Sequence, residues 1–163
     1  MAPLEVKKHS LISRIKFTAQ DLIHPLSIHL EVSLREKPLA PSTSQLETLY
    51  PISPYPIIRH LGWEEILAEK IRACLIRAKS RDMFDIWYLL TKDVALNWNM
   101  VSQKMAYYNT AVSPDELITR VENLKPSDFV KDLAQFLPST QRPLLKELKF
   151  KLLAKLKTSS GYS

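Results

Sequence analysis

The sequence predicts an α+β fold in which a small β region precedes a mainly helical bundle. Apolar and polar residues alternate in the N-terminal third, whereas apolar residues recur at helical spacing from Trp63 onward. A proline-rich stretch separates the two patterns. We therefore expect a β region with a proline-rich loop over residues 1–61 and a helical domain over residues 62–163.

The clearest periodicity lies between Leu26 and Leu34. Leucine, isoleucine and valine occupy every second position there, with polar residues between them, which predicts a half-buried strand. A weaker alternation over residues 13–18 predicts a second strand, which can pair with the first through a turn around Asp21. A third short strand is expected over residues 57–60.

Roughly from Lys37 to Pro56 the chain should form a loop, because this stretch holds five of the eleven prolines. Proline lacks a backbone donor and disfavours both regular strand pairing and helix. Beyond the loop, helices are predicted from helical composition, acidic first turns and prolines near the segment ends. The predicted helices cover residues 63–77, 80–91, 97–109, 114–124, 127–137 and 142–157.

Composition excludes several classes of protein. The 163 residues suggest one domain, or one with an appendage, and 45% hydrophobic with 25% charged residues is typical of a soluble globular chain. Gly62 and Gly161 are the only glycines, too few for a phosphate-binding loop or a dinucleotide-binding turn. Cys74 alone allows no intramolecular disulfide or zinc ribbon. With no long apolar run, we expect a cytoplasmic protein without a membrane partner.

The net charge of +6 is concentrated near the C-terminus. Residues 141–157 hold six basic residues and one acidic residue. Leucines at 145, 148, 152 and 156 form an apolar stripe on the predicted helix, and Lys146, Lys149 and Lys157 lie on the opposite side. A basic amphipathic helix can bind nucleic acid or a partner protein, or it can simply be solvated on its charged face.

Two predicted helices, 63–77 and 80–91, bring charged side chains together. Lys70 and Arg77 share one helical stripe, while Asp82 and Asp85 are three residues apart on the next helix. A short turn makes the helices neighbours, so the cations can face the aspartates across an open groove. The structural alternative is that Arg77 and Arg81 pair with the aspartates and only tie the hairpin together.

This segment resembles the signature of the AbiEii/AbiGii toxin family of nucleotidyltransferases. The resemblance rests on the run EEILAEKIRA at 64–73, followed by RAKSRDMFDIWYLL at 77–90. The strand IHLEVSLRE at 28–36 is similar to the family's strand upstream of that signature. The close resemblance covers about residues 11–91 and implies that the predicted strands are the remnant of a nucleotidyltransferase-like domain.

The resemblance also implies an activity and its residues. Family enzymes hold a Mg²⁺-bound nucleoside triphosphate and transfer a nucleotide to an acceptor, with RNA ends as one acceptor class, in toxin–antitoxin systems and phage defence. A cognate antitoxin would be the protein partner. Glu31 would be a catalytic, metal-binding carboxylate, although it can equally be a solvated strand residue. Lys70 would be catalytic and would contact the triphosphate. Asp82 and Asp85 would be catalytic residues that orient Lys70 or assist at the acceptor. Arg77 and Arg81 would be further contacts to the phosphates.

The chain departs from the family pattern in one respect. The family's first motif, a Gly-Ser pair followed by Asp-x-Asp, does not occur in this sequence. We therefore expect the chain to be the C-terminal portion of a family member. Because one carboxylate cannot organise two Mg²⁺ ions, we also expect that this chain alone transfers no nucleotide. The alternative function is a non-catalytic helical module that binds RNA or a protein.

Overall fold

The structure, a computed structural model, describes residues 4–18 and 24–159 of the chain. The chain divides into two compact units, Met1–Lys37 and Pro38–Ser163. The domain boundary expected at residue 61 from composition stays a prediction.

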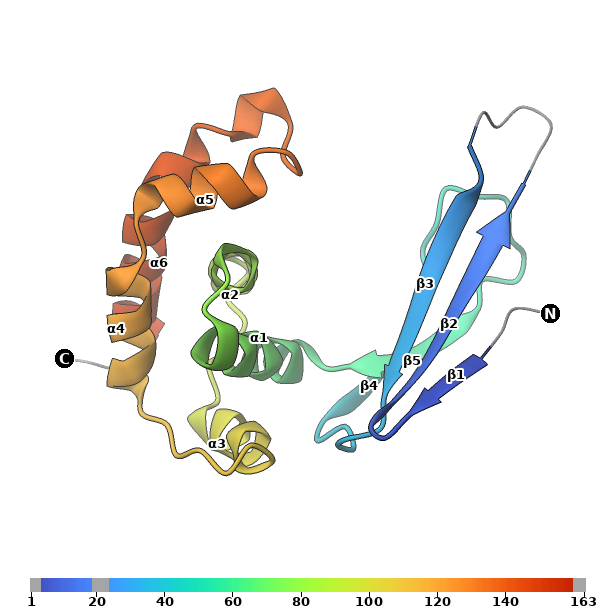
Figure 1. Cartoon of the computed structure of the whole chain (residues 1–163), viewed down its shortest axis with the longest axis horizontal. Helices are drawn as coiled ribbons and strands as arrows, with labels where there is room; N and C mark the ends of the chain where they lie inside the picture. The colour runs from blue at the N-terminus through green and yellow to red at the C-terminus, as the bar shows by residue number, and fades with distance from the viewer. Residues whose placement is uncertain (1–3, 19–23, 160–163) are drawn as a thin grey trace. The chain divides into compact units, whose positions relative to one another are not determined.

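The first unit is a three-stranded antiparallel sheet in the order β1–β2–β3 (Figure 1). Its strands are β1 (Leu4–Lys7), β2 (Ser10–Phe17) and β3 (Leu26–Ser33). The predicted pairing of the two longer strands is confirmed, with Ile15 opposite Ile28 and Ile12 opposite Glu31. The predicted turn around Asp21 lies outside the described residues. Strand β1 was not predicted, because four residues give too short an alternation to recognise.

The prediction that the strand over 26–34 is half-buried is wrong. Every residue of β3 is exposed, and its apolar side chains from Leu26 to Val32 are 46–58% accessible to solvent. Cross-strand partners share a face of a sheet, so Leu11 and Ile15 extend the same apolar face onto β2. The strand pattern therefore identified the apolar face correctly, but a single sheet has no second layer to cover that face within its own unit.

The second unit begins with a two-stranded hairpin, which corrects the prediction of an irregular loop from 37 to 56. Strand β4 (Pro41–Gln45) pairs antiparallel with β5 (Ile57–Leu61), and the latter confirms the predicted third strand. Proline is compatible with β4 because Pro41 is its first residue, where no ladder donor is required. The remaining prolines of the stretch fall outside the paired residues.

Within the described part of the chain, six α-helices and one short 3₁₀ helix follow. Their bounds are α1 (Trp63–Arg77), α2 (Ser80–Thr91), α3 (Trp98–Ala106), α4 (Pro114–Asn123), α5 (Pro126–Leu133), η1 (Ser139–Gln141) and α6 (Leu144–Ser159). Prediction and structure agree best at α1 and α2. Helix α5 ends at Leu133, four residues earlier than predicted. No helix in the described ranges combines the length and apolar character required to cross a bilayer.

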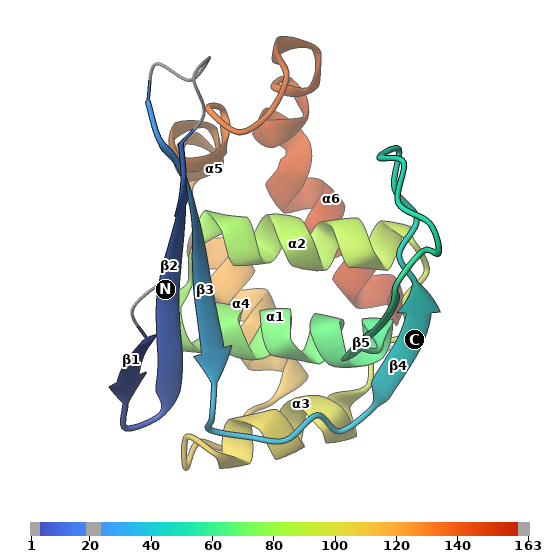
Figure 2. The same ribbon diagram turned by 90° about the vertical axis from the view of Figure 1, so that its right-hand side faces the viewer.

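Helices α1 and α2 lie side by side at the centre of the helical unit, with α6 packed on α2 and α3 on α1 (Figure 2). One continuous apolar core joins them, and it includes Leu67, Ile71 and Cys74 on α1. The four leucines predicted to form a stripe on α6 are all buried in the same core. Burial of these side chains supplies the main favourable term for folding of this unit.

The hairpin is attached to α1 by polar contacts at the start of that helix. The carboxylate of Glu65, which is fully buried, accepts hydrogen bonds from the backbone amides of Leu39 and Ala40 at 2.9 and 2.6 Å. The amide of Gly62 donates to the Ala40 carbonyl at 2.8 Å. A Cβ atom at Gly62 would stand 2.9 Å from that same oxygen, so this close approach requires glycine.

Candidate functional site

The candidate site lies at the turn between α1 and α2. Helix α1 is capped at its C-terminus by Ala78, which adopts a left-handed conformation with φ of 46° and donates its amide to the Cys74 carbonyl. Helix α2 begins only two residues later, at Ser80. This tight reversal places the last two turns of α1 beside the first two turns of α2. The predicted proximity of their charged side chains follows directly from it.

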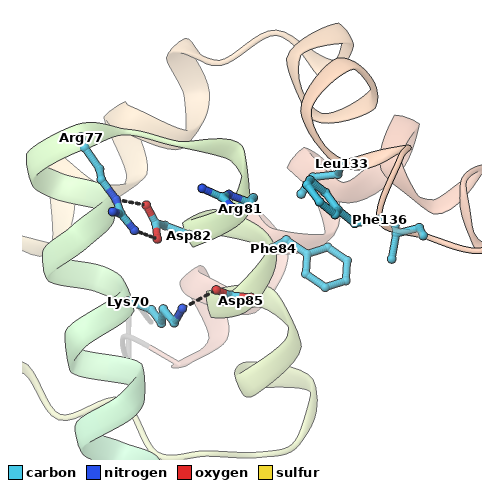
Figure 3. A pocket seen from close by; sticks show the side chains of 9 residues that line it. Lys70, Arg77, Arg81, Asp82, Phe84, Asp85, Leu133 and Phe136 are labelled. Atoms are coloured by element: carbon cyan, nitrogen blue, oxygen red, sulfur yellow. Dashed lines mark hydrogen bonds and ion pairs between the residues drawn. The ribbon is translucent and has the colours of Figure 1, made fainter. Parts of the chain in front are cut away.

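Two ion pairs bridge the helices, as Figure 3 shows. The Lys70 ammonium lies 2.6 Å from the Asp85 carboxylate, and both side chains are about one-third exposed, at 37%. Arg77 donates two hydrogen bonds of 2.7 Å to Asp82, one to each carboxylate oxygen. The Asp82 side chain is buried, whereas half of the Arg77 side chain is exposed. This charge-assisted bidentate pair fixes the direction of the guanidinium, and the hydrogen bonds that Arg77 donates to Asp82 raise the pKa of Arg77.

The structural alternative is only partly correct. Arg77 does pair with Asp82, but Asp85 pairs with Lys70 and not with Arg81. Among the residues that the structure describes, none forms an ion pair or hydrogen bond with the Arg81 guanidinium. Arg81 is exposed and reaches the same cavity as Lys70 and Arg77. One cation of the group is therefore available without breaking any contact.

The charged side chains form one wall of a cavity of about 450 Å³. The opposite wall is apolar and comes from Phe84 on α2 and from the end of α5 and the segment after it (Figure 3). The residues that line the cavity are Lys70, Arg77, Arg81, Asp82, Phe84, Asp85, Leu133, Phe136 and Leu137. A cavity of this size with one charged and one apolar wall matches the dimensions of small-molecule sites in proteins.

Polar contacts hold the apolar wall against the charged one. The Ser80 hydroxyl, at the start of α2, donates to the Asp132 carboxylate near the end of α5 at 2.9 Å. The Arg142 guanidinium donates to the carbonyl of Leu137 at 3.2 Å. Arg142 is one of the six basic residues of 141–157, so part of that charge has a structural use. Sequence reasoning missed the part of this wall formed by Leu133, Phe136 and Leu137, since these residues lie about fifty positions from α2.

The cavity residues suit the phosphates of a nucleotide but not a Mg²⁺ ion. Lys70, Arg77 and Arg81 offer three cations at one surface. The carboxylates of Asp82 and Asp85 are engaged by Arg77 and Lys70, which leaves no carboxylate cluster for a hard cation. Within the described part of the chain, no three side chains of histidine, cysteine, aspartate or glutamate lie together in a group able to hold a metal.

The predicted metal ligand, Glu31, lies on β3 in the first unit. Its side chain is exposed, and it shares the polar face of the sheet with His29. The structure therefore brings Lys70, Arg77, Arg81, Asp82 and Asp85 together in one cavity, and Glu31 is not among the residues that line it.

A buried charge cluster between α1 and α3 escaped the sequence analysis. The Lys104 ammonium, almost fully buried, lies 2.6 Å from Glu65 and 3.0 Å from Glu69. Arg72 in turn donates to Glu69 at 2.7 Å and to the Tyr108 hydroxyl at 2.9 Å. Burial by itself raises the pKa of Glu65 and of Glu69, yet hydrogen bonds to Lys104 and other donors leave both pKa values below the ordinary value of 4.5. This cluster joins α3 to α1 and to the hairpin.

The charged face of α6 is not uniformly solvated. Lys149 donates to the carbonyls of Glu122 and Leu124 at 2.6 and 2.9 Å, at the C-terminal end of α4. A cation at that end satisfies unpaired helix carbonyls and interacts favourably with the helix dipole. Lys151 and Lys155, with Trp87 from α2, line a second and shallower hollow between α2 and α6.

Comparison with known proteins identifies the family of this chain. The family model described as "Nucleotidyl transferase AbiEii toxin, Type IV TA system" matches residues 5–152, which is most of the chain. No curated protein and no solved structure matches the chain. The matched range includes β2, β3, most of β1 and every residue that lines the cavity. The chain therefore belongs to the AbiEii family of nucleotidyl transferase toxins from Type IV toxin–antitoxin systems.

Proposed function

We propose that the cavity of α1 and α2 binds the triphosphate of a nucleoside triphosphate for nucleotidyl transfer. The observation that carries the proposal is the convergence of Lys70, Arg77 and Arg81 on one wall of a cavity of nucleotide size. Clustered cations stabilise phosphate groups in the ground state and offset the charge that develops during phosphoryl transfer. Lys70 is the proposed central contact because its ammonium is a compact charge on a flexible stem.

The two aspartates are proposed as positioning residues. Asp85 holds the Lys70 ammonium at the cavity, and Asp82 fixes the Arg77 guanidinium through two parallel hydrogen bonds. Both pairs reduce the side-chain entropy that each cation loses when a phosphate binds. Lys70 and Asp85 are both partly exposed, so a phosphate can approach the ammonium from the solvent side.

The whole reaction is proposed to need more than this chain provides. Two of the family's metal-binding carboxylates belong to the Asp-x-Asp motif, which this sequence lacks. We accordingly propose that Glu31 contributes one carboxylate to metal binding, and that the chain alone does not transfer nucleotides. An RNA end is the proposed acceptor and a cognate antitoxin the proposed partner, in the cytoplasm; the family description supports only the toxin–antitoxin context.

Isothermal calorimetric titration of the chain with ATP tests the phosphate site. Lys70→Ala should weaken binding about tenfold or more, because hydrogen bonds to charged groups contribute about 1.5–3 kcal/mol. Lys146→Ala on α6 is the matched control, since it removes the same charge from an exposed position that does not line the cavity. Equal affinities for the wild type, Lys70→Ala and Lys146→Ala chains would contradict the proposal.

Transfer is tested separately with labelled nucleoside triphosphates, Mg²⁺ and total RNA. We expect no incorporation of label by the chain alone. Incorporation that disappears in Lys70→Ala would show that the chain is a complete transferase and would refute the proposed incompleteness. Such a result would leave the assignment of the phosphate site intact.

A second candidate function is RNA binding by the helical unit without catalysis. The observation that favours it is the hollow lined by Trp87, Lys151 and Lys155, which combines an aromatic side chain with two cations. Binding there should weaken steeply as salt rises, because cations that contact phosphates release counterions. The double variant K151A/K155A should lose RNA affinity while K146A/K157A keeps it. Affinity that is independent of salt would exclude this function.

A further inference from the structure

The apolar wall of the α1–α2 cavity has no use in binding phosphates. Leu133 is buried, but Phe136, in the segment after α5, is 62% exposed and borders the cavity. Figure 3 shows Phe84 and Phe136 on the side of the cavity away from Lys70 and Asp85. An exposed phenylalanine beside a charged surface normally costs solvation free energy, and its position at a cavity indicates a flat apolar ligand group.

We propose that this wall binds the base of the nucleotide whose phosphates contact Lys70, with Phe136 as the residue that contacts the base. The inference rests on the proposed phosphate site and adds a nucleoside subsite to it. A nucleoside triphosphate has a charged end and a flat aromatic end, and the cavity has a charged wall and an apolar, aromatic wall to match. Stacking of a base on an aromatic ring tolerates any base, because every base has a π-face.

The wall is built into the fold and is not an incidental surface. Phe84 is held by Trp87 on the same helix, with ring centroids 5.6 Å apart and the planes tilted by 55°. The hydrogen bond from Ser80 to Asp132 joins α2 to the end of α5, immediately before Leu133. The Arg142 contact with the Leu137 carbonyl holds the segment that carries Phe136 on its other side. Both walls of the cavity therefore keep a defined separation before any ligand binds.

Comparison of nucleotides with inorganic tripolyphosphate tests the subsite on the full chain. Calorimetric titrations with ATP, CTP and tripolyphosphate, all with Mg²⁺, should show both nucleotides binding about tenfold more tightly than tripolyphosphate. Phe136→Ala should remove most of that difference and leave the affinity for tripolyphosphate unchanged. Phe150→Ala is the control, because Phe150 on α6 is similarly exposed, at 65%, and does not line the cavity.

The outcomes separate this inference from the phosphate site. If tripolyphosphate binds as tightly as the nucleotides and Lys70→Ala weakens both, the phosphate site stands and the base subsite is refuted. Nucleotide binding that is unchanged in Phe136→Ala also refutes the subsite. If neither tripolyphosphate nor nucleotide binds, the phosphate site and the base subsite both fail.

Discussion

Replacing Lys104 by methionine should strongly destabilise the helical unit. Lys104 is almost completely buried, and its ammonium lies 2.6 Å from the fully buried carboxylate of Glu65. Methionine has a similar volume and fills the same space, so the main effect is loss of charge. Removing one partner of a buried ion pair leaves the other charge uncompensated, which costs about 3–5 kcal/mol. We expect the lower end, about 3 kcal/mol, because two backbone amides still donate to Glu65.

Urea denaturation followed by tryptophan fluorescence measures this loss. All three tryptophans, at positions 63, 87 and 98, belong to the unit Pro38–Ser163, so the signal reports on the helical unit. Lys151→Met is the matched control, since Lys151 forms an exposed ion pair with Glu147 at 3.2 Å. Exposed pairs contribute about 0–1 kcal/mol, so the control should unfold almost like the wild type.

A second substitution distinguishes lost charge pairing from poor packing. Glu65→Gln in the Lys104→Met background removes the uncompensated negative charge and should restore part of the lost stability. Equal unfolding free energies for Lys104→Met and Lys151→Met would refute the reasoning. A double variant less stable than Lys104→Met would show that relief of the uncompensated charge does not outweigh the acceptor that one of the two backbone amides loses when glutamine replaces Glu65.

Three further predictions concern the core of the helical unit. The pKa values of Glu65 and Glu69 are lower in the folded state than the ordinary 4.5. The two carboxylates therefore contribute stability above pH 4.5, and this contribution is lost as the pH falls through their folded-state pKa values. Urea unfolding midpoints measured from about pH 6 downward should decrease accordingly. Burial, together with the charge of nearby Asp82, raises the pKa of the Cys74 thiol to about 12. A thiol reagent at about pH 8 should therefore label Cys74 only when the chain is unfolded in urea. Labelling of the native chain would contradict the burial of Cys74. Leu148→Ala should lower the free energy of unfolding by about 2–5 kcal/mol, because the Leu148 side chain is fully buried. Phe150→Ala, on the same helix but exposed, should stay within about 0.5 kcal/mol of the wild type. Similar urea midpoints for the two variants would contradict the assignment of the core face of α6.

The sequence predicted those parts of the fold in which local pattern and packing agree. Helix α1 was predicted at its observed bounds, because the segment has helical composition and an acidic first turn. The facing of Lys70 and Asp85 followed from helical geometry and a short turn, which are both local properties.

Other features depended on contacts between distant residues and left no local signal. Lys104 reads as an ordinary polar position on α3, and only the fold shows that Glu65, thirty-nine positions earlier, makes its burial possible. Strand β4 was missed because its proline is acceptable only at the first position, where pairing with β5 begins. The alternation over 26–34 predicted the strand but not its exposure, since burial depends on a covering layer.

The division of the chain after Lys37 makes the proposed roles separable by genetics. Every residue that lines the cavity, and every contact that holds its two walls, lies between Pro38 and Ser163, whereas Glu31 belongs to the preceding unit. A shortened chain that starts at Pro38 keeps the attachment of the hairpin to α1 through Glu65 and Gly62. Nucleotide affinity of this shortened chain then reports on the cavity alone, and any loss relative to the full chain measures the contribution of the sheet that carries Glu31.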